Sequence, residues 1–393
     1  MESTKNVPAP VEGVRSRLDA AFSTAAGRLI PMEGLRGFAV LLVFLVHYHT
    51  LFGNFLRSGS ALNVSQFTHA IGNTGVDIFF VLSGFLIYGH LLRKDLGFGP
   101  FLKRRIRRIY PTFLAVLAIY VVLSHVVVSA SKMPPTWKGE LVYVAENFFL
   151  LPGIFDIPPL ISVSWSLSYE FFFYLSIPII VNAGGLRKWR PPMRCALFLG
   201  LFVLHALGYA LGLLPHIRLS MFLGGMLLFE IVDGGWVRGR LSQRGEWVVI
   251  TGYLCVLGIL GWRNLTNNAL ANNQGTPLTY TGLLFLALPA VVLYALVFQG
   301  LLNRIFTAKP MRWVGNMSYS YFLIHGLVLN GAAIAARKIL GDAILPIPIY
   351  LLLMAFNLVS TLIVGLVLYL AVEWPLSLRH LSPPRAANAL TAP

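Results

Sequence analysis

The chain of 393 residues is 56% hydrophobic and only 12% charged. Soluble domains carry about 25% charged residues, so this composition excludes a string of soluble domains and indicates a polytopic membrane protein. The net charge of +16 would suit a nucleic-acid-binding protein, but most of the 31 Lys and Arg residues fall in alternate loops between the apolar runs. This asymmetry follows the positive-inside rule. It predicts that both termini are cytoplasmic, and no nucleic-acid partner is expected.

Continuous apolar runs predict about ten transmembrane helices, each long enough to cross the hydrocarbon core of a bilayer. We therefore expect an all-α polytopic membrane protein. A cytoplasmic N-terminal arm over residues 1–30 and a short cytoplasmic tail over residues 376–393 would flank a transmembrane domain of residues 31–375. The predicted spans cover residues 37–55, 75–92, 109–128, 165–183, 195–213, 216–232, 246–262, 277–300, 315–335 and 346–372.

The first predicted span carries an arginine and a histidine at a fixed spacing, Arg36 and His47, with ten uncharged residues between them. Eleven helical steps of about 100° place both side chains on one face, about 16 Å apart along the axis. We expect Arg36 at a membrane border and His47 deep in the apolar layer. An ionisable side chain at that depth indicates a functional site, and the alternative is a histidine that only packs against a neighbouring helix.

Two acidic residues, Asp77 and Glu170, begin the second and fourth predicted spans. With both termini inside, they lie one to two turns below the outer border, in the same half of the bilayer as His47. A buried carboxylate needs a cationic or hydrogen-bonding partner, so we expect these residues to converge on His47 or on a water-filled pocket. The alternative is that they are ordinary polar residues at helix ends.

A third ionisable residue, His325, lies in the ninth predicted span at a depth similar to that of His47. Its neighbours Ser318, Tyr319 and Tyr321 give that helix a polar face. Polar residues of this kind form hydrogen bonds between membrane helices, and ionisable ones also mark functional sites. The sequence leaves a structural and a catalytic role for His325 equally open.

A basic cluster opens the third span and contains Arg104, Arg105, Arg107 and Arg108. Arg104 and Arg108 are one helical turn apart, so they could hold phosphate groups in a bidentate manner. The alternative is that the cluster only anchors the helix to anionic lipid headgroups.

Taken in order, these segments resemble the motifs of the acyltransferase 3 family of integral membrane acyltransferases. Residues 36–47 are similar to the family's arginine-x10-histidine motif, and the likeness extends over about residues 30–375. Glu33 stands where the family often has aspartate. Unlike some members, the chain is expected to carry no extracytoplasmic hydrolase-like domain after its last span. The later matching segments are residues 75–85, 104–111, 165–170 with Tyr174, and 318–325.

The resemblance implies transfer of an acyl group, often acetyl, from cytoplasmic acyl-CoA to a hydroxyl of a glycan or lipid-linked acceptor, at a bacterial inner membrane. His47 would act as the general base, since the pKa of an unperturbed histidine is close to neutral pH. Glu170 or Asp77 would orient the imidazole or the acceptor. The residues expected to bind acyl-CoA are Arg36, Arg104, Arg105, Arg107 and Arg108, and the candidate supporting residues are Ser166, Ser168, Tyr174, Ser318 and His325.

No permanently bound cofactor is expected, because acyl-CoA would serve as a co-substrate. Cys195 and Cys255 both fall in predicted spans, so neither a disulfide framework nor a cysteine-based metal site is expected. A proton-coupled secondary transporter of a glycan or lipid remains the alternative, because intramembrane His and Glu residues serve as proton relays in that class. The sequence shows no inverted repeat of the kind typical of such transporters.

Overall fold

The computed structural model describes residues 29–57, 59–128, 131–214, 217–237, 239–267 and 278–379. Within these ranges the regular structure is helical, apart from one isolated bridge between Pro152 and Phe155, which confirms the all-α prediction. The expected N-terminal arm and C-terminal tail lie outside the described residues, apart from their inner ends. The larger helices are α2 (Ile30–Phe52), α3 (Ser60–Gly72), α4 (Thr74–Arg93), α5 (Phe98–Val126), α6 (Trp137–Phe148), α7 (Ser164–Ala183), α8 (Pro191–Ala210), α9 (Ser220–Asp233), α10 (Gln243–Asn267), α11 (Leu278–Val297), α14 (Ser318–Leu340) and α15 (Ile347–Leu368).

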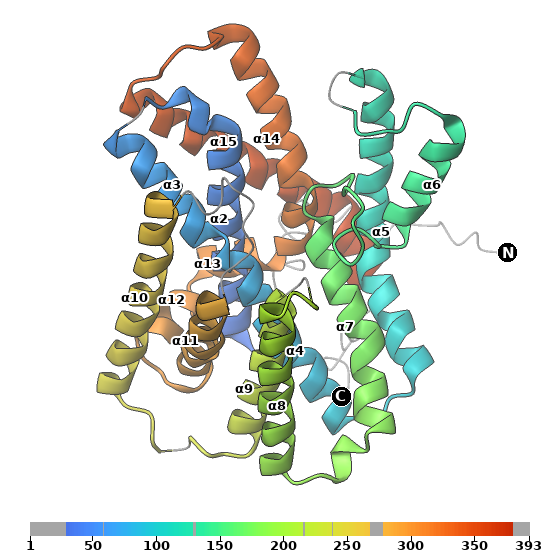
Figure 1. Ribbon diagram of the computed structural model, residues 1–393, viewed down its shortest axis with the longest axis vertical. Coiled ribbons are helices and arrows are strands. Elements are labelled where there is room, and N and C mark those ends of the chain that lie inside the picture. The colour runs from blue at the N-terminus through green and yellow to red at the C-terminus, as the bar shows by residue number, and fades with distance from the viewer. Residues whose placement is uncertain are drawn as a thin grey trace, which may run out of the picture.

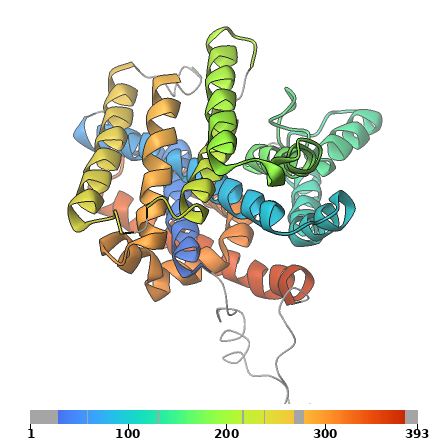
Figure 2. The same cartoon turned by 90° about the horizontal axis from the view of Figure 1, so that it is seen from below.

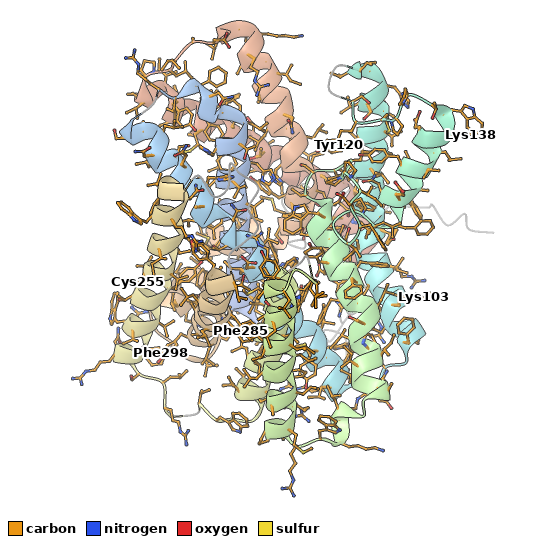
Figure 3. The ribbon with its side chains drawn as sticks, in the orientation of Figure 1. Lys103, Tyr120, Lys138, Cys255, Phe285 and Phe298 are labelled. Carbon is orange, nitrogen blue, oxygen red and sulfur yellow. The ribbon has the colours of Figure 1, made fainter. Side chains whose placement is uncertain are left out.

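Shorter elements connect these helices. They are the 3-10 turns η1 (Gly53–Phe55), η3 (Leu186–Lys188) and η4 (Ile217–Leu219), the helices α12 (Leu301–Thr307) and α13 (Lys309–Asn316), and the π-helical stretch η5 (Tyr369–Leu378) that continues α15. In two perpendicular views α4 runs through the middle of the array, with α5 and α6 on one side and α10 and α11 on the other (Figure 1 and Figure 2). Side chains cover the whole helical body, and Cys255 lies on the outer surface of α10 (Figure 3).

Among the described residues, nine helical segments are long and apolar enough to cross a membrane, against about ten predicted. The chain is therefore a multi-pass integral membrane protein. The difference lies at residues 216–232, where α9 has only 14 residues and follows the turn η4. A helix of that length rises about 21 Å, which is less than the roughly 30 Å thickness of the hydrocarbon core.

The second membrane segment begins earlier than the sequence pattern predicts. It runs from Ser60 to Arg93 and consists of α3 followed by α4. At the junction α4 approaches α2 very closely, since a Cβ atom on Gly75 would lie 2.6 Å from the carbonyl oxygen of Ala39. Only glycine allows such a contact between backbones. As a result, α4 starts beside the middle of α2, well below the His47 turn.

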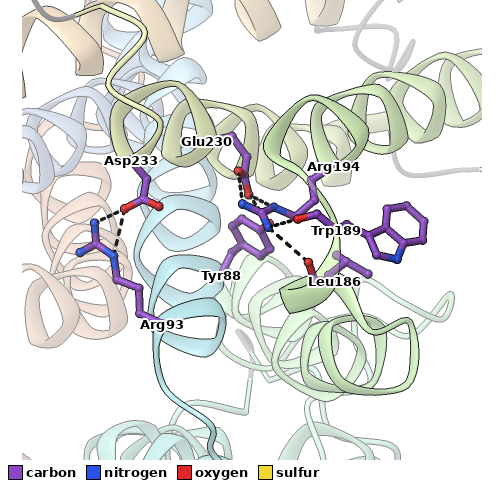
Figure 4. A network of polar contacts seen from close by, with 7 residues as sticks. All are labelled: Tyr88, Arg93, Leu186, Trp189, Arg194, Glu230 and Asp233. Atoms are coloured by element: carbon purple, nitrogen blue, oxygen red, sulfur yellow. Dashed lines mark hydrogen bonds and ion pairs between the residues drawn. The ribbon is translucent and has the colours of Figure 1, made fainter.

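A buried polar network fastens α4 to α8 and α9 (Figure 4). Arg194 donates hydrogen bonds of 2.7 Å to both carboxylate oxygens of Glu230, and it also reaches the carbonyl oxygens of Leu186 and Trp189. Tyr88 of α4 donates its hydroxyl to the same Glu230. The Arg194 and Glu230 side chains are only 8% and 1% exposed. The network holds α4, α8 and α9 in one arrangement, because a buried charge that loses its partner strongly destabilises the fold.

A matched surface pair also joins α4 and α9. Arg93 of α4 pairs with Asp233 of α9, and their side chains are 64% and 35% exposed (Figure 4). We expect Glu230→Ala to lower the free energy of unfolding by about 3–5 kcal/mol, because Arg194 is then left buried without a counter-charge. Asp233→Ala should change it by less than about 1 kcal/mol, since water screens an exposed pair. Thermal unfolding in detergent measures the stability of both variants. Equal losses of stability would contradict the conclusion that the buried network stabilises the fold.

Candidate active site

A cavity of about 150 Å³ opens among α2, α4, α5, α7 and α14. Its wall is apolar toward α4 and charged toward the N-terminal ends of α2 and α5. We call the end where α2 begins the inner end, because the positive-inside rule predicts that it faces the cytoplasm. The side chains that line the cavity are Arg36, Val76, Phe79, Phe80, Leu82, Ser83, Leu86, Ile87, Arg105, Arg108, Ser166, Leu167, Glu170, Tyr174, Ser318, Tyr319 and Phe322.

Arg36 is a cation at this cavity that forms no close ion pair with a described residue. It is half-buried, and it makes no hydrogen bond with another described residue. It lies in the electrostatic field of Arg108, Glu170 and Glu373, with the arginine repelling it and the two carboxylates attracting it. A guanidinium placed this way offers five unused N–H donors to an anionic ligand.

Two other arginines of the basic cluster reach the cavity, namely Arg105 and Arg108. Arg105 lies 5.5 Å from the ring centre of Tyr174, and Arg108 lies 5.6 Å from that of Tyr319. Arg104 and Arg107 are exposed and do not line the cavity. The clamp expected from Arg104 and Arg108 is therefore not formed here, because the helix turns Arg105, and not Arg104, toward the cavity beside Arg108.

Glu373 is a site residue that the sequence reasoning missed. It lies fully buried on the π-helical stretch η5, and its carboxylate pairs with Arg108 at 2.5 Å. The other carboxylate oxygen accepts hydrogen bonds from the backbone N–H and the hydroxyl of Ser320, at 3.0 and 2.5 Å. A π-helical stretch often marks a functional position. A lone acid inside the apolar run 347–374 was the signal that could have revealed it.

Glu170 lies on the cavity wall as a hydrogen-bond acceptor. Its Oε1 atom receives the hydroxyls of Tyr174 at 2.5 Å and of Ser83 at 2.8 Å. It therefore meets the expectation of a pocket location, but its bonds go to these hydroxyls and not to His47. Of the other supporting candidates, Ser166 and Ser318 line the cavity, whereas the Ser168 hydroxyl turns back onto the carbonyl oxygen of Ser164.

The structure brings His47 and His325 together, with ring centres 4.8 Å apart in an edge-to-face arrangement. In both residues Nδ1 lies near the carbonyl oxygen four positions earlier, 3.0 Å from Val43 for His47 and 3.1 Å from Tyr321 for His325. A carbonyl oxygen only accepts hydrogen bonds, so Nδ1 must carry the proton in each ring. The free lone pair is then on Nε2, and the Nε2 atom of His325 is buried with no hydrogen-bond partner among the described residues.

Asp77 is not part of this arrangement. Its carboxylate is buried and lies 3.7 Å from the Nε atom of Arg218, whose guanidinium stacks over Trp165. Asp77 does not line the cavity and has no hydrogen bond to His47. The expectation that Asp77 joins His47 is therefore wrong in geometry. The cause is the early start of the membrane segment at Ser60, which carries Asp77 below the level of the histidine pair.

The fold and the cavity together define a multi-pass membrane protein with a basic cavity inside its helical domain. The family model described as an acyltransferase domain matches residues 30–369, and the chain belongs to this family, acyltransferase 3. The resemblance inferred from the motifs is thus confirmed. Among the described residues, no three His, Cys, Asp or Glu side chains come together as metal ligands.

Curated relatives match about three quarters of this chain. It is 28% identical to the peptidoglycan O-acetyltransferase OatA of Listeria monocytogenes, over 75% of this chain and 48% of the relative. It is 29% identical to the putative peptidoglycan O-acetyltransferase YrhL of Bacillus subtilis, over 76% and 48%. The exopolysaccharide production protein ExoZ of Rhizobium meliloti is 27% identical, over 78% of this chain and 90% of the relative. The chain thus spans about half the length of the first two. No solved structure matches it.

Replacing Glu373 tests whether its charge holds Arg108 at the cavity. If the chain transfers acyl groups as its family does, we expect Glu373→Gln to lower that rate about tenfold or more, because a hydrogen bond between charged groups contributes about 1.5–3 kcal/mol and each 1.36 kcal/mol in the barrier is tenfold in rate. Rate assays on the purified protein measure the change, alongside thermal unfolding to confirm folding.

Glu246→Gln is the matched control. Glu246 is equally buried and also accepts a backbone N–H at a helix start, that of Leu302 at 2.8 Å, but it lies away from the cavity. Its replacement should leave activity unchanged within about twofold, since surface and structural changes away from a site act mainly on stability. Equal losses of activity in the two variants would show that Glu373 has only a structural role.

Proposed function

We propose that the protein is a membrane O-acyltransferase that moves an acyl group, acetyl in the first instance, from cytoplasmic acyl-CoA to a hydroxyl of a glycan or lipid-linked acceptor. The observation that carries this proposal is the position of Arg36 and His47 on one continuous helix. Arg36 lines the cavity and forms no close ion pair with a described residue, and His47 lies about 16 Å further along with an Nε2 atom that makes no hydrogen bond to a described residue. One helix therefore connects an anion site with a base.

The inner end of the cavity suits the donor. Acyl-CoA carries its phosphates at one end of a flexible arm and its thioester at the other. Guanidinium groups bind phosphates through paired N–H donors, so Arg36, Arg105 and Arg108 would hold the nucleotide end. The arm would then run along α2 toward the histidine pair. The length of this arm is comparable to the spacing of Arg36 and His47.

The chemical step needs a base and a path for one proton. The acceptor oxygen forms a bond to the thioester carbon as the carbon–sulfur bond breaks. His47 Nε2 takes the hydroxyl proton and returns it to the leaving thiolate, so no net proton is released. The His325 ring packs against His47 and keeps it in position. An acyl group carried covalently by a histidine would divide this step into two, with the same overall balance.

The relatives support a glycan acceptor. Two carry names that specify peptidoglycan O-acetylation, and a third is named for exopolysaccharide production.

The alternative of a proton-coupled transporter gains little from the geometry. The Glu170 carboxylate accepts hydrogen bonds from Tyr174 and Ser83, and it forms no hydrogen bond with His47 or His325, so these three residues do not form a His–Glu proton relay.

Replacing the base provides the direct test. With purified protein in nanodiscs and labelled acetyl-CoA, we expect His47→Ala to reduce thiol release and ester formation about 10²–10⁴-fold, the usual contribution of a general base. Water serves as the slow acceptor, and a chito-oligosaccharide is added as a glycan acceptor. His205→Ala on α8 is the control and should keep wild-type rates. A wild-type protein that releases no thiol from acetyl-CoA, or a His47→Ala variant with full activity, would refute the proposal.

The role of Arg36 is separable from that of the base. We expect Arg36→Ala to raise the KM for acetyl-CoA about tenfold or more, because one bidentate charged contact is lost. The KM for acetyl-pantetheine, which lacks the nucleotide phosphates, should not change. Steady-state kinetics with both donors measure this difference. An equal rise for both donors would show that Arg36 shapes the cavity and does not bind the phosphates.

A further inference from the structure

The inner cavity and the histidine pair are not continuous in the structure. Neither His47 nor His325 lines the cavity. Two aromatic side chains that do line it, Phe79 of α4 and Phe322 of α14, face each other with ring centres 5.9 Å apart. The Phe322 ring is in turn 6.0 Å from the ring of His325, three residues further along the same helix. The two phenylalanines therefore stand between the cavity and the histidines.

Core packing places Phe79 at the same boundary. One cluster of buried residues surrounds the cavity and includes Val76, Phe80 and Leu167. A second cluster surrounds the histidine pair and includes Phe44 and Tyr48 of α2. Phe79 is half-buried and packs against both clusters. It closes the space between them from the side of α4.

We propose that Phe79 and Phe322 form an aromatic barrier that the acyl group must pass to reach the histidine pair, and that this barrier limits the size of the acyl group transferred. The inference rests on the proposed function, in which the thioester approaches from the inner end. Both rings are half-buried and held by packing alone. Such side chains change rotamer without breaking a hydrogen bond, so the barrier can open for a small group.

The expected selectivity follows from the apolar wall. An acetyl group places one methyl against the rings, whereas longer acyl groups place a chain there. A single additional methylene that does not fit an apolar pocket changes kcat/KM by about 10–200-fold. The wild-type protein should therefore prefer acetyl-CoA strongly over butyryl-CoA. Removing one ring should relax that preference, and enlarging it should sharpen it.

The experiment compares thiol release from acetyl-CoA and butyryl-CoA by the full-length protein in nanodiscs, with water and with a chito-oligosaccharide as acceptors. Phe322→Ala and Phe79→Ala should raise the ratio of butyryl to acetyl kcat/KM about tenfold or more. Phe322→Trp should lower the rate with acetyl-CoA, because the larger ring narrows the passage. Phe322→Leu provides a shorter apolar side chain that keeps most of the packing, should the alanine variant fail to fold.

Phe202→Ala is the matched control. Phe202 is also half-buried and packs against one ring, that of Phe285 at 3.8 Å, but it lies on α8 away from the cavity. The ratio of butyryl to acetyl kcat/KM in the Phe202→Ala variant should equal that of the wild type. A wild-type ratio in folded Phe322→Leu and Phe79→Ala would overturn the barrier while leaving the proposed function intact. Absence of thiol release from every acyl-CoA by the wild type would instead refute the proposed function itself.

Discussion

The arrangement of the site follows from one constraint, that an ionised side chain inside the apolar layer needs a partner. Arg108 meets the constraint through Glu373, and Glu170 meets it through the hydroxyls of Tyr174 and Ser83. Arg36 has no such partner among the described residues, although it lies in the same helical domain. The cavity is therefore a place where a bound anion would complete the pairing. A ligand that brings its own negative charge stabilises the site that receives it.

The ion pair between Arg108 and Glu373 connects the cavity with the helix that carries His325. Glu373 binds Arg108 of α5 and caps the start of α14 at Ser320, and α14 carries His325 little more than one turn further along. α2 likewise carries Arg36 near its start and His47 near its end. Because the uninterrupted helix α2 carries both Arg36 and His47, the distance between them is set by helix geometry. Sites built on rigid helices hold such distances more accurately than sites on loops.

The sequence predicts well those features that depend on a single helix. The apolar runs and the placement of Arg36 and His47 on one helix follow from local periodicity. The pocket position of Glu170 follows from the need of a buried carboxylate for a partner. Features that depend on helix rotation or on distant pairing are not predicted in this way. Neighbouring arginines in a basic run differ in direction by about 100°, so Arg105 could not be separated from Arg104. The partner of Glu373 lies 265 positions away. Asp77 lies deeper in its membrane segment than predicted, because the polar residues of α3 do not indicate that the segment begins at Ser60.

Under the proposed function, the separation of His47 from the cavity would have a chemical advantage. A thioester is open to attack by water, and a nearby base would activate that water as readily as an acceptor alcohol. The Nε2 atom of His325 is buried, and the rings of Phe79 and Phe322 lie between the histidines and the inner cavity. Under the proposed function, water that enters with the nucleotide would be kept from His47 until an acyl group displaces the rings. Exclusion of water protects a reactive intermediate and strengthens the electrostatic interactions that act on it. If the protein carries an activated acyl group past this point, as proposed, the two rings would protect that group from hydrolysis on the way to the histidines.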